Sequence, residues 1–153
     1  MGILDGYFGT RHPDAGTPPR TAQEVRSALL ALNGPDVLFV VRNGTGKEGD
    51  LVAECRLPQL RVRLRTRMRL DAAKHEVRAL DEQWEILQSE HTRGQHSRGP
   101  ANAVYRVWEK QKGPDGREHR VETFRFETRE MKDPLRRTVL EAGWTWRGVL
   151  FRL

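Results

Sequence analysis

The sequence of 153 residues contains a single cysteine, Cys55, and no hydrophobic run approaching 18 residues. A lone cysteine cannot form an internal disulfide, and the missing apolar run excludes a membrane-spanning helix. The first residues resemble neither a secretory signal nor a myristoylation signal, which requires Ser or Thr at position six. We therefore expect a soluble, cytoplasmic protein without membrane insertion.

Motifs of catalysis and metal binding are also missing. The sequence has no Gly-x-Ser-x-Gly, His-Glu-x-x-His or Cys-x-x-Cys. Cys55 falls in an expected strand without a nearby histidine, which favours a small buried hydrophobe over a nucleophile. His91 and His96 lie in a polar loop over 89–102 with no cysteine and one acid, Glu90, beside them, so a metal site would need ligands from elsewhere. We expect no metal and no cofactor, although a site assembled from distant residues would leave no such motif.

The chain is basic, with a formal net charge of +6 and a pI near 10.1. Such a charge invites a nucleic-acid hypothesis. The excess of basic over acidic side chains is spread along the chain rather than gathered in a tail. Most of the basic residues are arginines. A GC-rich genome favours arginine through its codons, so arginine richness alone is weak evidence of function.

One stretch alternates strictly between arginines and apolar or β-branched residues, from Arg61 to Leu70. This period of two predicts a β-strand with an arginine face and a core face. Neighbouring arginines on one face would lie roughly 6.8 Å apart, within the Debye length, and would repel each other unless anions intervene. The five arginines are Arg61, Arg63, Arg65, Arg67 and Arg69.

The following stretch, 76–87, is expected to return beside the arginine strand. Leu80, Trp84 and Ile86 share one parity and predict its core face, and a β-bulge near 78–80 would bring the earlier residues into step. In this register Leu64 meets Leu80 on the core face. The opposite face would set Arg63 against Asp81 and Arg61 near Glu85.

Two interpretations of the arginine face follow. The face is solvated and partly ion-paired, or it binds an external anion. Only three acids, Glu76, Asp81 and Glu85, are expected across from the five arginines. The face would therefore keep a net positive charge, which favours the second interpretation. The candidate anion-binding residues are Arg61, Arg63, Arg65, Arg67 and Arg69, together with Arg93 and Arg98 in the loop 89–102.

The remaining pattern predicts one α+β domain over 21–153 after an irregular N-terminal arm over 1–20. Thr21 and Glu24 form a capping box before a helix over about 22–33. Asp133 and Pro134 predict the start of a C-terminal helix that ends at Gly143. Turns near 71–74 and 113–116 predict hairpins. We expect an antiparallel sheet of about six strands built from hairpins, with one N-terminal and one C-terminal helix.

Three passages resemble a family of small uncharacterised actinobacterial proteins. They are Asp5 to Gly9, Arg20 to Asn33, and Asp133 to Gly148. The resemblance agrees with the GC-rich codon signature and covers most of the chain. It implies no activity and identifies no functional residue.

Three functions remain open. The first is a non-catalytic interaction domain that binds an unknown protein or another copy of itself. The second is weak, non-specific polyanion or nucleic-acid binding through the arginine strand, directed to the backbone because that strand carries no aromatic side chain among its arginines. The third is an apolar small-ligand pocket framed by Trp84, Tyr105, Trp108, Phe124, Phe126, Trp144 and Trp146.

Overall fold

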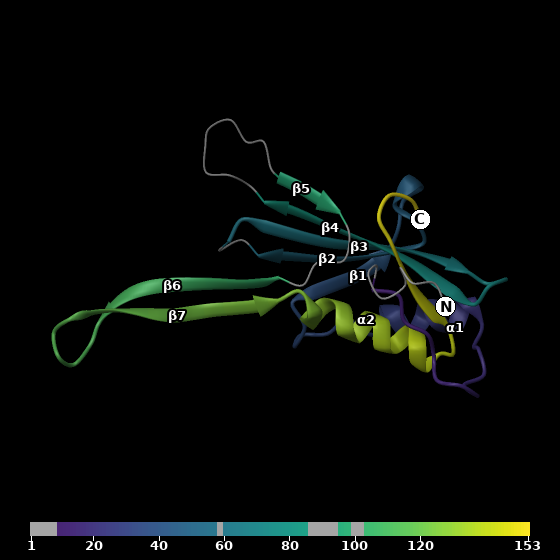
Figure 1. Ribbon diagram of the computed structural model, residues 1–153, viewed down its shortest axis with the longest axis horizontal. Coiled ribbons are helices and arrows are strands. Elements are labelled where there is room, and N and C mark those ends of the chain that lie inside the picture. Colours follow the sequence, from purple (N-terminus) through teal and green to yellow (C-terminus); the bar gives the residue numbers. More distant parts are fainter. Residues whose placement is uncertain (1–8, 58–59, 86–94, 99–102) are drawn as a thin grey trace.

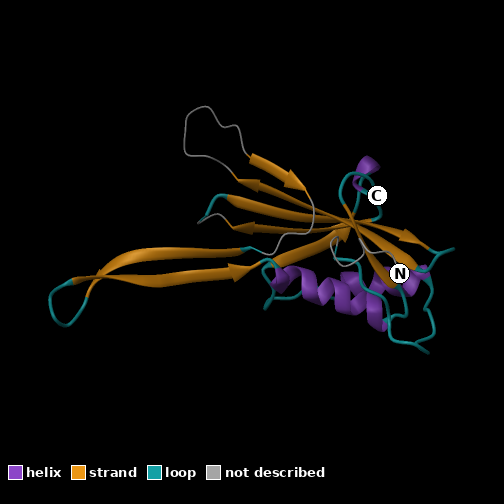
Figure 2. Ribbon diagram, viewed as in Figure 1, coloured by secondary structure: helices purple, strands orange, loops and turns teal. Residues whose placement is uncertain are grey.

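The structure, a computed structural model, describes residues 9–57, 60–85, 95–98 and 103–153, with the backbone alone described for 85 and 95–98. These residues form two α-helices, a short 3-10 helix and a set of β-strands (Figure 2). The helical elements are α1 (Ala22–Leu30), η1 (Gly46–Glu48) and α2 (Arg129–Glu141). The strands are β1 (Phe39–Asn43), β2 (Leu51–Leu57), β3 (Val62–Asp71), β4 (Glu76–Glu85), β5 (Gln95–Arg98), β6 (Val104–Lys112), β7 (Glu118–Glu127) and β8 (Thr145–Val149).

The α+β class and the mainly antiparallel pairing are confirmed. Within the described residues the main sheet follows the order β1-β2-β3-β4-β5, and β8 pairs with β4 from outside this path. The expectation of one hairpin-built sheet of six strands is wrong in two respects. The pairing of β8 with β4 is parallel, and β6 and β7 form a separate two-stranded sheet. Of the loop 89–102, Gln95–Arg98 is a strand, while Arg93 lies outside the described residues.

Both helices form where their sequences favour them, but α2 begins earlier than expected. The capping box of α1 is present, with the Thr21 hydroxyl accepting from the Glu24 N–H. The start of α2 at Arg129 places Pro134 inside the helix rather than at its first position. Met131 and Leu135 are buried, so apolar residues on both sides of Pro134 pack into the core and outweigh the hydrogen bond that proline cannot make.

The core lies between the two helices and one face of the main sheet (Figure 1). Val25 and Leu29 of α1 and Leu135 and Val139 of α2 are fully buried there. The sheet contributes the even-numbered residues of β3, as its alternation predicts. Of these residues, Val62, Leu64, Thr66 and Met68 are at most 6% exposed.

The chain ends are held at β8. Segment 10–12 covers the outer edge of this strand, where Arg11 and Trp146 exchange backbone hydrogen bonds of 2.8 and 2.9 Å. The Trp144 indole donates to the Arg20 carbonyl at 2.7 Å. Trp144 and Trp146 are buried, so these two residues pack against the body of the domain.

The register of β3 with β4 differs from the expected one. Arg63 lies opposite Trp84, Arg65 opposite Glu82 and Leu64 opposite Gln83, without a bulge. Leu80 and Trp84 therefore share the face of the arginines, and Asp81 lies on the helix-covered face. The expected pairs of Arg63 with Asp81 and Leu64 with Leu80 are wrong, and so is the placement of Arg61 near Glu85, which lies opposite Val62 on the other face.

Strands β6 and β7 form a ribbon that extends away from the rest of the domain (Figure 1). We call this ribbon, Val104–Glu127, the arm. Its strands join at a turn over 113–116, as predicted, where Gly116 has a φ of 77°. Residues on both faces of its outer part are exposed.

Candidate functional site: the arginine face and the arm

The sheet surface opposite the helices is built from alternate residues of β1 to β4. Because β2 sets Glu54 opposite Arg65 and Val52 opposite Arg67, acidic and apolar residues lie among the arginines. We call this surface the arginine face. Its described members include Arg42, Val52, Glu54, Arg56, Arg63, Arg65, Arg67, Arg69, Arg78, Leu80, Glu82 and Trp84.

Three glutamates neutralise the middle of the arginine face. Glu82 pairs with Arg65 Nη2 at 2.9 Å and with Arg67 Nε at 2.7 Å, each through Oε1. The Glu82 side chain is only 2% exposed. Glu54 pairs with Arg63, and the arginine also lies opposite Trp84.

The third glutamate, Glu48, comes from η1 rather than from a strand. Arg42 binds it through two nitrogens, at 3.1 and 2.7 Å, and Arg65 Nη1 lies 3.5 Å from its Oε2. Such a two-point guanidinium–carboxylate contact is among the stronger hydrogen-bonded pairs in proteins. Sequence reasoning missed Glu48 and Glu54 because it considered only the strand that follows β3.

The arginines shift the acid strength of these carboxylates. Hydrogen bonds from Arg42, and then from Thr45, lower the pKa of Glu48 well below its usual range. Burial raises the pKa of Glu54, but the hydrogen bond and charge of Arg63 outweigh it, so that the pKa is lowered overall. Both carboxylates are ionised at neutral pH and serve as the counter-ions of the face.

The arginine face carries its own apolar layer. Val52 lies between Arg42 and Arg67 across the strands, Leu80 lies opposite Arg67, and both apolar residues are 0% exposed. The guanidinium carbons of Arg63 and Arg65 lie 5.2 and 4.7 Å from the Trp84 ring centroid. Trp84, which was expected on the core face, therefore lies on the arginine face. It comes from β4, since β3 itself has no aromatic residue, and its ring lies against Arg63 and Arg65.

The candidate anion-binding residues whose side chains are described differ in their surroundings. Arg65 and Arg67 are 17% and 16% exposed at their side chains, so their guanidinium groups are directed to acids of the same chain. Arg69 is exposed and lies opposite Arg78, and Arg61 is exposed before β3 begins. Arg98 lies opposite Glu82 in the backbone register of β5, and its side chain is not described.

The arm presents the second candidate surface. Trp108 is 45% exposed, Val104 47% and Val121 38%. Arg120 lies over the Trp108 ring at 5.8 Å, and Arg106 pairs with Glu122 at 3.9 Å. The base of the arm is anchored, because Phe126 is 1% exposed and belongs to the core.

Catalytic chemistry finds little support in the described residues. Burial, and to a smaller extent the charge of Glu130, raises the pKa of the Cys55 thiol to about 11, which disfavours the thiolate. Among the described residues no group of three His, Cys, Asp or Glu could hold a metal ion. Asp81 accepts from the Thr66 hydroxyl at 2.8 Å and pairs with Lys132 at 2.8 Å on the helix-covered face, which satisfies these buried groups structurally.

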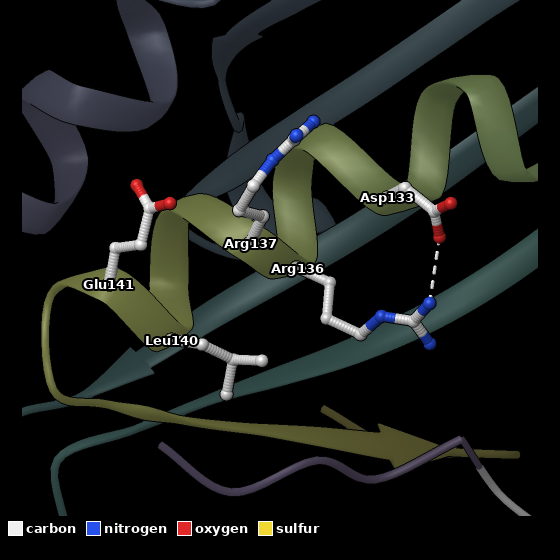
Figure 3. A pocket seen from close by; sticks show the side chains of 5 residues that line it. All are labelled: Asp133, Arg136, Arg137, Leu140 and Glu141. Carbon is white, nitrogen blue, oxygen red and sulfur yellow. Dashed lines mark hydrogen bonds and ion pairs between the residues drawn. The ribbon is translucent and has the colours of Figure 1, made fainter. Parts of the chain in front are cut away.

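The aromatic residues that were expected to frame an apolar pocket are dispersed. Trp144, Trp146 and Phe126 fill the core, Trp84 lies on the arginine face and Trp108 on the arm. A hollow of about 380 Å³ lies instead along α2 (Figure 3), lined by Asp133, Arg136, Arg137, Leu140 and Glu141. Arg136 is already paired with Asp133 at 2.7 Å there. Since all five lining residues come from one helix, the hollow offers no convergent set of reactive groups.

Comparison with known proteins adds no relative. No protein-family model matches the chain, and searches of curated proteins and of solved structures find no match either. The resemblance to actinobacterial proteins stays a prediction. Within the described residues, no helix has the length and apolar character needed to cross a membrane.

Proposed function

We propose that this chain is a non-catalytic interaction domain whose contact element is the arm. The observation that carries the proposal is a two-stranded ribbon that extends from an otherwise packed domain (Figure 1) and exposes Val104, Trp108 and Val121. An isolated two-stranded hairpin is at best marginally stable in water. A partner that covers the outer part of the arm would supply the contacts that the domain does not.

The edges of the main sheet and of the arm differ in a way that supports this proposal. The Asn33 side chain accepts from the Val41 N–H and donates to the Val41 carbonyl, each at 2.7 Å, so that the middle of the β1 edge is blocked. Segment 10–12 covers β8. In the described part of the chain β7 pairs only with β6. Proteins commonly protect sheet edges that are not used for contacts.

The test shortens the arm without touching its anchored base. Glu109 lies directly opposite Val121, so residues 110–120 can be replaced by Asn-Gly, which closes a two-residue hairpin. We expect the shortened protein to melt like the wild type, because Phe126 and the rest of the core are retained. In native cell extract the wild type should elute well above its 17.7 kDa monomer mass, and the shortened protein near the monomer position. Equal elution of both as monomers would refute the proposal.

Weak polyanion binding is the second candidate. It is favoured by Arg69 opposite Arg78 and by the exposed Arg56, where the arginine face has more cations than acids. Binding would be non-specific, and on duplex DNA each phosphate contact should contribute about −0.9 to the slope of log K against log salt. Heparin or random-oligonucleotide titration at two salt concentrations tests it. Loss of binding in an Arg56→Gln/Arg69→Gln variant would support this candidate, and no binding by the wild type at low salt would refute it.

A further inference from the structure

The backbone of β7 has one side directed away from β6. At the base the Thr128 N–H donates to the Ala103 carbonyl, and at the tip the Gly113 N–H donates to the Arg117 carbonyl. Because an antiparallel ladder alternates between bonded and non-bonded pairs, these two bonds fix which residues direct their N–H and C=O groups outward. On β7 the outward residues are Glu118, Arg120, Glu122, Arg125 and Glu127.

A register shift in β7 changes the sequence spacing of these outward residues, but their side chains stay on one face of the arm. Val107 lies opposite Phe124, whereas Trp108 lies opposite Glu122, so Thr123 is an extra residue in β7. The ion pair of Arg106 with Glu122 places the outward residues on either side of the shift on the same face of the arm. Along this edge the charges alternate strictly between acid and base.

Alternating charge makes the β7 edge complementary to itself. When two copies pair antiparallel about a two-fold axis between Glu122 and Arg125, Glu122 meets Arg125 of the second copy, and Arg120 meets Glu127. Opposite charges directly across an antiparallel pair stabilise it, and a two-fold axis repeats each contact. An axis through Glu122 itself would instead set Arg120 against Arg125.

The β6 edge lacks this property. Its outward residues are Val104, Arg106, Trp108, Lys110 and Lys112, which include three cations and no acid. No antiparallel pairing of this edge with itself can set an acid against a base, because its outward residues include no acid. On β7 the backbone is available up to Arg125, since the Glu127 N–H already donates to the Glu130 carboxylate at 2.6 Å.

We infer that the partner of the arm is a second copy of this chain, joined through the β7 edges of both copies. This inference rests on the proposed interaction function and names its partner. The contact joins the two arms into one four-stranded sheet, and Thr123 of each copy lies next to the axis, opposite Phe124 of the other copy. It gives the outward N–H and C=O groups of Glu122 and Arg125 protein partners in place of water.

Charge exchange tests the inference. Arg125→Glu sets two acids against each other at both repeats of the contact, and Glu122→Arg sets two bases. We expect wild type to reach twice 17.7 kDa in sedimentation velocity as concentration rises, and each single variant to dissociate at least about tenfold more readily. An equimolar mixture of the two single variants should associate again, because each contact is then acid to base. The double variant should associate with itself for the same reason.

Several outcomes would overturn this inference. They are a wild type that stays monomeric at every concentration, single variants that associate like wild type, and a mixture that stays monomeric although both variants melt normally. Association only after addition of a random-sequence oligonucleotide, lost in Lys110→Gln/Lys112→Gln, would assign the arm to a polyanion instead. If purified wild type is monomeric but the shortened arm still abolishes the larger complex in extract, the interaction function stands and the second copy is wrong as the partner.

Discussion

Arg65 and Glu82 lie directly opposite each other on β3 and β4, and their side chains form an ion pair of 2.9 Å between Nη2 and Oε1. Glu82 shares the same oxygen with Arg67, and its side chain is 2% exposed. The arginine face is therefore held together by internal pairing across four strands, β1 to β4, and η1. Each of its central arginines has a structural role.

We expect Arg65→Gln to destabilise the fold. The substitution removes one of the cationic partners of the buried Glu82 carboxylate. A buried group that loses a hydrogen-bonding partner in this way costs about 1–3 kcal/mol. Urea unfolding should show this loss. The matched control is Arg69→Gln on the same strand and face, which is exposed and should stay within about 0.5 kcal/mol of wild type. Equal loss in both variants would contradict the internal role of Arg65.

The lowered pKa values of Glu48 and Glu54 predict an acid-sensitive fold. In the unfolded chain these carboxyls take up protons near their ordinary pKa of about 4.3, while the folded protein holds them ionised to lower pH. The unfolded state then binds more protons, so stability rises with pH in this range and is lost as pH falls below it. Chemical unfolding at several pH values should show this slope, and Glu48→Gln should reduce it.

Asn33→Ala should expose the β1 edge. The variant loses two hydrogen bonds to Val41 and leaves that strand free to pair with other chains. We expect a loss of about 1–2 kcal/mol and faster aggregation near the melting temperature. Urea unfolding measures the loss of stability, and light scattering during a thermal ramp measures the aggregation. Asn33→Asp, which keeps the acceptor alone, should be intermediate. Unchanged aggregation in the alanine variant would contradict a protective role.

Val139→Asp should unfold the protein or destabilise it by several kcal/mol, because Val139 is 0% exposed in α2 and an unpaired carboxylate there has no partner. Arg137→Asp is the control two residues earlier on the same helix, where the side chain is exposed. Circular dichroism melts should separate the two variants clearly. Similar melting temperatures would mean that this side of α2 does not face the core.

Sequence patterns with a strict period predicted their elements well. The alternation from Arg61 to Leu70 identified β3 and both of its faces, and Thr21 with Glu24 identified the start of α1. The turn residues near 113–116 identified the β6–β7 hairpin. These signals are local, so they depend little on the rest of the chain.

The register of β4 could not be predicted in the same way. Leu80 and Trp84 suggested a core face, but they lie on the arginine face, where arginine stems cover apolar residues while their charged ends reach acids. Because arginine stems are apolar, a leucine can be buried beneath them on a charged face. The alternation of apolar residues in a sequence therefore does not show whether they face the core or such an arginine layer. The acids Glu48 and Glu54 are contributed by η1 and β2, which only the folded sheet places beside β3.

The sequence does contain a signal that β6 and β7 form a separate sheet, although the predicted strand pairing did not use it. Residues 109–112 and 117–120 contain charged and polar side chains on both faces, so this part of the hairpin has no apolar face to bury. A strand that packs on a core requires one. The same polar character explains why β6 and β7 form a separate sheet that extends beyond its anchor in the core at Phe126.

The central claim is that the arm, rather than the arginine face, is the contact surface. Photo-crosslinking in living cells tests it most directly, with a benzoylphenylalanine in place of Val121 on the arm or of Arg69 on the arginine face. Both positions are exposed, and Lys74 in the β3–β4 turn serves as an exposed control. The account predicts a protein adduct from position 121 and none from positions 69 and 74. An adduct from position 69 with none from position 121 would contradict it.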